Sequence, residues 1–402
     1  MVWLVLILLT LIVWLDVKIW RVNLTPISIS LVPLIGVVVL SELMGWRFGF
    51  LPISMYSATY ILISSACSLT VSMIVRHFSG GVKDVIPYSG VSERVVQICW
   101  AISLVISYVY IWKVFSSAGG LTNLGEDRLK DLYDGGIAGH LRVFQMFMFA
   151  YSLVFVKKVS KKTLILAAMS ALLFVIYPVK GWVLIGLITP WVGRRVLYGG
   201  EVAIRQVAVV LAVGVLVFFA VYLVGAGLFT GEVSLVFLRE VAIHFLKYLF
   251  AGVLGFSGMV SGPVGEGESG ALLAPLVNVI HACMGLAYVE IISPYWYPTN
   301  CHISEGTNVF TFWGTLYQYG GFVGGLAACS IIHVILYIFL SIRKSVEFVV
   351  LYSMLLMAMS FAWFEYYYWH LYFYECTVFA VLFWAVNRLF GSGNGVKKGE
   401  GP

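Results

Sequence analysis

The sequence predicts an all-α fold: a polytopic integral membrane helical bundle of about eleven transmembrane helices with a long periplasmic loop. Composition is the first reason, because 61% of the 402 residues are apolar, 11% are charged, and the mean hydropathy is +0.96. A soluble chain of this length cannot bury that much apolar surface, so the bilayer must be its solvent. The second reason is that apolar runs of about 20 residues recur, a length that crosses a hydrocarbon core of about 30 Å as a helix.

In chain order the predicted spans form one membrane domain, 1–402, and lie at about 1–19, 27–45, 53–75, 95–116, 141–156, 163–178, 181–193, 205–225, 310–341, 346–363 and 371–390. Two runs, 141–156 and 181–193, are short, so we expect these helices to tilt less or to extend into their flanks. The first run has neither a basic start nor a small-residue cleavage site, so no cleavable signal is expected.

Basic residues predict the orientation. Placing six alternating segments in the cytoplasm collects 17 of the 25 Lys and Arg residues on that side, as the positive-inside rule requires. The N-terminus is then periplasmic and the C-terminus cytoplasmic in a bacterial inner membrane. The outward segments are 117–140, 178–181, 225–310 and 364–370. The net charge of +6 follows from this topology and gives no signal for nucleic acid.

Some basic residues remain on the outward side, where the charge rule does not explain them. The functional interpretation is a cationic pocket for phosphate, in which Arg supplies bidentate hydrogen bonds. The alternative is ordinary loop charge, since 117–140 is also rich in acidic residues. The candidates for binding a pyrophosphate are Arg128, Arg142, Lys180 and Arg239.

The outward segment 225–310 has its own organisation. Apolar residues recur at helical spacing between Val233 and Phe250, with Glu240, His244 and Lys247 along one stripe. This pattern predicts an amphipathic helix that lies on the membrane surface or dips into it. The alternative is a re-entrant or twelfth helix over 241–259. A glycine-rich link follows at 262–270.

The loop closes on the polar residues 301–308, directly before the next apolar span. Glu305 and His302 are the first candidates for a general base, and Glu240 and His244 are secondary candidates. The alternative for each is a positioning role. Two ligands without a third make a weak metal site, so no metal and no cofactor are expected.

The cysteines and aromatics leave alternatives open. Cys283 and Cys301 both lie in the outward loop, where an oxidising periplasm permits a disulfide, and the sequence does not decide whether they pair. The dense aromatic run 364–375 is either an interfacial belt or a platform for sugar rings, with its carboxylates accepting hydroxyl hydrogen bonds.

Three stretches resemble the Wzy-type O-antigen (oligosaccharide repeat unit) polymerases. The stretch 305–311, Glu-Gly-Thr-Asn-Val-Phe-Thr, and the stretch 317–325, Tyr-Gln-Tyr-Gly-Gly-Phe-Val-Gly-Gly, resemble the family's Thr-Asn-Val-x-Thr…aromatic-Gly-x-x-Gly signature. The stretch 244–252 looks like its outward-loop helix. Two positions depart from the family pattern: Gln318 stands where Asp is common, and Lys180 where Arg is common.

The resemblance implies a membrane glycosyltransferase that polymerises undecaprenyl-pyrophosphate-linked repeat units on the periplasmic face. The growing glycan is transferred to a sugar hydroxyl of a second lipid-linked unit, with inversion at the anomeric carbon and without metal. Its implied partners are the two lipid-linked glycans, the bilayer and a chain-length regulator protein. Its implied substrate-binding residues are His244, Tyr248, Asn308, Thr311 and Tyr317.

Two other functions fit a chain of this class. An O-antigen ligase shares the topology and the donor but uses lipid A core as acceptor. A transporter or flippase of lipid-linked sugars is also a polytopic helical bundle, although it usually shows repeats between its halves and polar residues at mid-membrane. The Thr-Asn-Val-x-Thr signature favours the polymerase.

Overall fold

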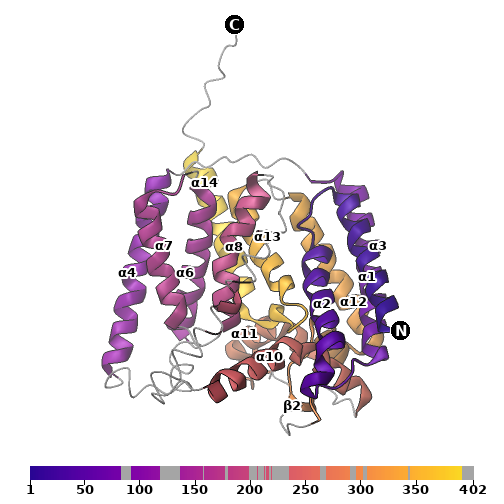
Figure 1. The fold of residues 1–402 in the computed structure, drawn as a ribbon. Helices are drawn as coiled ribbons and strands as arrows, with labels where there is room; N and C mark the ends of the chain where they lie inside the picture. The colour runs from indigo at the N-terminus through magenta and orange to yellow at the C-terminus, as the bar shows by residue number, and fades with distance from the viewer. Residues whose placement is uncertain are drawn as a thin grey trace. The chain divides into compact units, whose positions relative to one another are not determined.

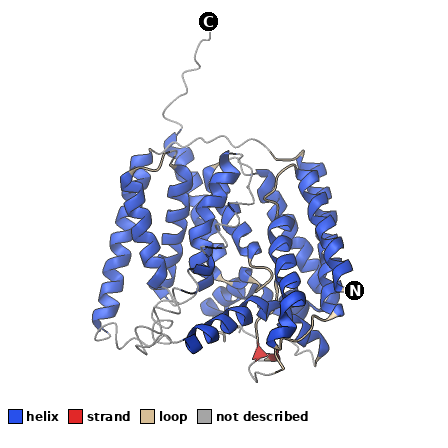
Figure 2. Cartoon of the chain, in the orientation of Figure 1, coloured by secondary structure: helices blue, strands red, loops and turns tan. Residues whose placement is uncertain are grey.

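The computed structural model describes most of the chain and is drawn in Figure 1. The described residues are 1–82, 92–117, 136–156, 158–176, 180–198, a few positions between 206 and 219, 235–262, 269–289, 296–301, 306–342 and 345–391. In this part of the chain the elements are helices, apart from one pair of two-residue strands (Figure 2). The predicted all-α class is confirmed.

The chain forms two compact units. Unit 1 comprises 1–82, 202–341 and 355–371, and unit 2 comprises 83–201, 342–354 and 372–402. Unit 1 contains α1 (Val2–Trp20), α2 (Pro26–Met44), η1 (Gly45–Phe48), α3 (Met55–Ser79), α10 (Leu235–Ser261), η3 (Ser269–Leu273), α11 (Ala274–Met284), β1 (Tyr297–Pro298), β2 (Gly306–Thr307), α12 (Phe312–Ile342) and η4 (Tyr367–Trp369).

Unit 2 contains α4 (Glu93–Ser117), α6 (Gly136–Phe155), α7 (Lys161–Ile176), α8 (Lys180–Tyr198) and α14 (Leu371–Gly391). Helix α13 (Val346–Ser360) passes from unit 2 into unit 1. The short runs predicted at 141–156 and 181–193 do extend into their flanks, since α6 has 20 residues and α8 has 19.

Seven helices of the described part are long and apolar enough to cross a membrane: α1, α2 with η1, α3, α4, α6, α10 and α12. The protein is therefore a multi-pass membrane protein. Helices α7, α8, α13 and α14 coincide with further predicted spans but are shorter or less apolar. Most of the predicted span 205–225 and of the predicted loop 117–140 lies outside the described residues.

Local sequence sets several helix ends in unit 1. Helix α2 begins with a capping box, in which the Thr25 hydroxyl accepts from the Ser28 amide and the Ser28 hydroxyl accepts from the Thr25 amide. Pro26 occupies the first helical position, where its missing N–H costs nothing. Helix α3 ends at Gly80, whose φ of 69° is a conformation that glycine adopts without strain.

Side-chain contacts give the relative directions of the helices inside each unit. In unit 1, α1 and α3 run parallel, because Val5 and Ile61 line one cavity near their starts and Trp20 bonds Ser72 near their ends. In unit 2, α6 and α14 run parallel, because Phe144 contacts Phe379 and, two turns on, Tyr151 bonds Asn387. Successive membrane spans alternate in direction, so two spans with an odd number of spans between them must point the same way. The directions of both pairs agree with the predicted order of spans.

A buried carboxylate fastens three helices of unit 1. Asp16 of α1 is fully buried and accepts the Ser72 hydroxyl of α3 at 2.5 Å and the Tyr337 hydroxyl of α12 at 2.7 Å. The Trp20 indole donates to the same Ser72 at 2.7 Å and stacks on the Tyr337 ring. Since a polar group in hydrocarbon is costly unless it is bonded, these contacts explain how α1 carries an acid inside a span.

Replacing Asp16 with Ala should destabilise unit 1 by about 1–3 kcal/mol, because the Ser72 and Tyr337 hydroxyls lose their acceptor inside the bundle. The measurement is the thermal unfolding midpoint of the purified protein in detergent. Thr10→Val is the matched control on the same helix, since the Thr10 hydroxyl bonds only the Leu6 carbonyl of its own helix. Equal midpoints for the two variants would contradict a fastening role.

Candidate functional site

Helix α12 is a helical hairpin rather than one straight span. Gly321, with φ 63° and ψ −167°, breaks it between Phe312–Gly320 and 322–342. The Phe312 and His333 rings lie 6.2 Å apart, although a straight helix would separate these residues by about 31 Å. The sequence predicts a single span over 310–341; instead, a short arm folds back on an arm of 21 residues that is by itself long enough to cross the bilayer.

An extended segment leads into the short arm and takes its hydrogen bonds from neighbouring elements. Gly306 and Thr307 pair with Pro298 and Tyr297 in the β1–β2 ladder. The Val309 amide donates to the Thr307 hydroxyl, the Thr311 amide to the Gly252 carbonyl, and the Phe312 amide to the Ala362 carbonyl. The Thr311 hydroxyl accepts from the Gly314 amide and so caps α12.

Helix α10 offers this segment a face of glycines. Gly252, Gly255 and Gly258 are three residues apart and therefore share one side of the helix. A Cβ on Gly255 would stand 2.2 Å from the Val309 carbonyl oxygen, and one on Gly252 would stand 2.4 Å from the Phe364 carbonyl oxygen. Only glycine permits two non-helical backbones to approach α10 this closely.

Aromatic side chains from three elements meet beside the hairpin. The Tyr60 ring of α3 lies edge-on to Phe256 of α10 and to Tyr317 and Phe322 of α12, with centroids 5.1–5.8 Å apart. Tyr60 is buried, whereas the Tyr56 and Tyr317 hydroxyls meet at 3.2 Å in an exposed contact. Tyr317 thus presents a polar edge at the surface of an otherwise apolar cluster.

The loop between α13 and α14 carries a carboxyl group that sequence reasoning treated only as part of an aromatic run. Burial raises the pKa of Glu365 from 4.5 to about 7, and the nearby Trp369 indole offsets part of the rise. The adjacent Phe364 ring stacks on Tyr248 of α10, whose ring contacts His244 at 4.9 Å. A carboxyl group that titrates near neutrality is suited to accept and release a proton.

The structure places only part of the predicted site. Glu305, His302 and Arg128 lie outside the described residues, and for Lys180 only its position as the first residue of α8 is described. Arg142 is half-buried on α6 in unit 2, and Arg239 is exposed on α10 in unit 1, so a shared pyrophosphate pocket stays a prediction.

The predicted substrate-binding residues fall in unit 1. His244 and Tyr248 form one ring contact on α10, and Tyr317 belongs to the aromatic cluster. Asn308 is half-buried in the extended segment, and Thr311 is fully buried at the cap of α12. The predicted amphipathic helix and its alternative over 241–259 are parts of one helix, α10, that runs to Ser261.

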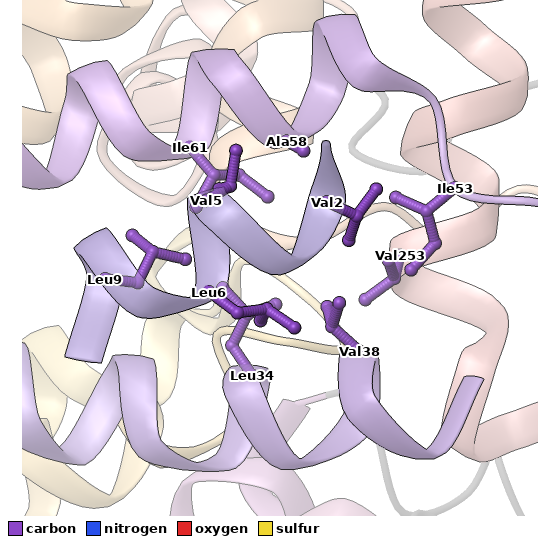
Figure 3. Close-up of a pocket in the computed structure, with 10 residues that line it drawn as sticks. All are labelled: Val2, Val5, Leu6, Leu9, Leu34, Val38, Ile53, Ala58, Ile61 and Val253. Carbon is purple, nitrogen blue, oxygen red and sulfur yellow. The ribbon is translucent and has the colours of Figure 1, made fainter. Parts of the chain in front are cut away.

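Cys283 and Cys301 are both exposed free thiols, so the structure contains no disulfide between them. Among the described residues no three His, Cys, Asp or Glu side chains gather into a metal-binding group. A small cavity, about 20 Å³, lies between the start of α1 and helices α2, α3 and α10 (Figure 3). Its lining is entirely apolar, from Val2 to Val253, so we expect it to stay dry and assign it no chemistry.

The glycine face yields a paired prediction. Gly255→Ala should displace the extended segment, because the new methyl group meets the Val309 carbonyl and the Thr307 side chain, and should lower the unfolding midpoint in detergent by several degrees. Gly324→Ala should leave the midpoint within about one degree or raise it, since a Cβ there meets nothing within 4 Å. Similar effects of both variants would argue against close packing at this face.

Glu365 predicts a pH-dependent stability. Its pKa is raised in the folded protein, so the protonated form is favoured there, and stability is lost as the pH rises from about 4.5 through about 7. Glu365→Gln mimics the neutral form and should be more stable than wild type at pH 8, by up to about 3 kcal/mol, and equal to it near pH 4.5. Detergent melts across this range test it, with Glu240→Gln, an exposed site on α10, as control. A parallel pH profile for wild type and Glu365→Gln would refute the assignment.

Comparison with known proteins gives one family. No curated protein and no solved structure is significantly similar to the chain. The profile of a family of unknown function, DUF6337, matches residues 39–392, a region that takes in the hairpin, α10 and the aromatic loop. The chain is therefore a member of the DUF6337 family.

Proposed function

We propose that this protein is a membrane glycosyltransferase that polymerises polyprenyl-pyrophosphate-linked oligosaccharide repeat units. The observation that carries the proposal is the packing of three segments that resemble the Wzy-type polymerases. The stretch 244–252 of α10, the stretch 305–311 and the aromatic-glycine stretch 317–325 are separated by up to 64 residues in sequence. In unit 1 the Gly252 carbonyl, at the end of the first stretch, accepts from the Thr311 amide of the second. Phe256, one turn further along α10, contacts Tyr317 of the third stretch.

The chemistry of the transfer sets what the site must supply. As the anomeric bond breaks, the sugar gains oxocarbenium character and the pyrophosphate gains negative charge. Cations around the leaving group stabilise that charge, for which Arg128, Arg142, Lys180 and Arg239 are the candidates. Exposed tyrosine edges such as Tyr317 suit the binding of sugar rings.

The proposal includes the membrane and the orientation. The basic segments support an inner membrane with the N-terminus in the periplasm, so that α10, the β1–β2 hairpin and the loop 361–370 face the periplasmic side. The parallel pairs α1–α3 and α6–α14 support the same alternation of spans.

A transporter of lipid-linked sugars is the second candidate. It is favoured by the broken helix α12, because non-helical backbone between two half-helices is a common feature of transporter binding sites. A transporter would move the lipid-linked unit across the bilayer without joining two units.

Deletion of the gene should leave lipopolysaccharide with a single repeat unit on the core, because export and ligation continue while polymerisation stops. Gels of the native host and of the complemented strain measure this. Bare core in the deletion strain would instead indicate a ligase or a transporter. Purified protein in proteoliposomes, supplied with a polyprenyl-pyrophosphate-linked repeat unit, should produce a ladder of polymers, and no ladder from active preparations would refute the polymerase.

A further inference from the structure

A glutamate and a histidine form a close pair in unit 2. His140 lies in the second turn of α6 and Glu375 in the second turn of α14, and the His140 Nδ1 atom lies 2.6 Å from the Glu375 Oε1 atom. The two side chains differ in exposure: 61% of His140 is accessible, but only 16% of Glu375. The carboxylate is therefore enclosed, while the imidazole projects outward.

The pair belongs to a series of side-chain contacts that join the two parallel helices. Below it, Phe144 lies edge-on to Phe379 at 5.2 Å, and Phe147 to Phe383 at 5.5 Å. At the far end, the Asn387 amide donates to the Tyr151 hydroxyl at 3.0 Å. Each contact advances by about one turn on both helices, so the register of the pair is fixed by packing rather than by the two polar groups alone.

The geometry determines the hydrogen-bonding pattern of the imidazole. A carboxylate accepts, so the Nδ1 atom carries the hydrogen and donates it to Glu375, which leaves Nε2 of the neutral ring as a proton acceptor. The second oxygen of Glu375, Oε2, is buried without a partner among the described residues. A carboxylate bonded to Nδ1 fixes the tautomer and the orientation of the ring.

We propose that His140, oriented by Glu375, is the general base that activates the acceptor sugar; this inference rests on the proposed glycosyltransferase function. Nε2 takes the proton of the acceptor hydroxyl as its oxygen forms a bond to the donor's anomeric carbon. The bond between that carbon and the pyrophosphate oxygen breaks, and the polyprenyl pyrophosphate leaves with the electron pair. The imidazolium then returns its proton to water.

Two neighbours fit this assignment. Arg142, a candidate for binding the leaving group, follows two residues later on α6. Its guanidinium lies near enough to the Tyr372 hydroxyl of α14 to interact with it electrostatically. The proposed base and a proposed pyrophosphate ligand thus project from the same turn of α6, the turn that enters the bundle from the outward side in the predicted topology.

The test uses full-length protein in proteoliposomes with a polyprenyl-pyrophosphate-linked repeat unit, and measures turnover and the donor KM. His140→Gln should fold, because its amide can still donate to Glu375, yet turnover should fall about 10²–10⁴-fold with little change in donor KM. His140→Gly should be equally slow and should regain rate when imidazole is added, since the site is exposed. Glu375→Gln should lose less turnover than His140→Gln, because the imidazole that takes the proton is still present.

His281→Ala is the matched control. His281 is half-buried on α11, and its Nδ1 atom bonds the Ala287 carbonyl of the loop that follows the helix, so the loss of its side chain should leave turnover unchanged. Wild-type turnover in His140→Gln would overturn the assignment and leave a structural pair, as would a slow His140→Gly enzyme that imidazole does not accelerate. A wild-type protein that makes no polymer would instead refute the proposed function itself, so the two failures are distinguishable.

Discussion

Backbone hydrogen bonding inside a lipid-facing protein is the constraint on which unit 1 depends. Hydrocarbon supplies no partners, so a chain that leaves helical geometry must find donors and acceptors on its neighbours. The segment that precedes α12 does so on one side with β1 and on the other with the Gly252 and Ala362 carbonyls. The glycine face of α10 makes the approach possible, and the cap at Thr311 then starts the short arm.

The same constraint explains why the polar chemistry gathers where it does. A non-helical segment whose backbone groups are bonded by neighbouring protein can hold a polar side chain such as Asn308 beside apolar helices. The aromatic cluster around Tyr60 and the stack of Phe364 on Tyr248 surround this segment with rigid rings. Glu365 follows Phe364 in the chain, and its burial raises its pKa to about 7.

The sequence predicts the positions of the helices well, but it does not predict where a helix breaks and turns back on itself. Apolar runs give the spans, because hydrophobic length is set by the bilayer. The break at Gly321 is not visible in that signal, since both arms of α12 are apolar and their sum resembles one long span. The glycines at 320, 321, 324 and 325 were the available cue, although glycine is also common in unbroken transmembrane helices.

The pair of His140 and Glu375 shows a different limit. The two residues are 235 positions apart, and neither stands in a motif, so only the register of α6 against α14 brings them together. Sequence reasoning instead favoured Glu305 and His302, because they lie three residues apart and directly before a recognisable signature. Proximity in sequence is visible without a structure, whereas proximity across parallel helices is not.

The parallel alignment of α6 and α14 also limits the number of times the chain crosses the membrane between them. Two neighbouring helices that point the same way require an odd number of membrane crossings between them. Helices α7, α8 and α13 and the long arm of α12 supply four crossings, if each spans. Exactly one further crossing can then come from α10 or the predicted span 205–225, but not from both. The contacts of α10 with Phe50, Ser54 and Ser57, all near the connection between α2 and α3, hold the second half of α10 against one end of that helix pair.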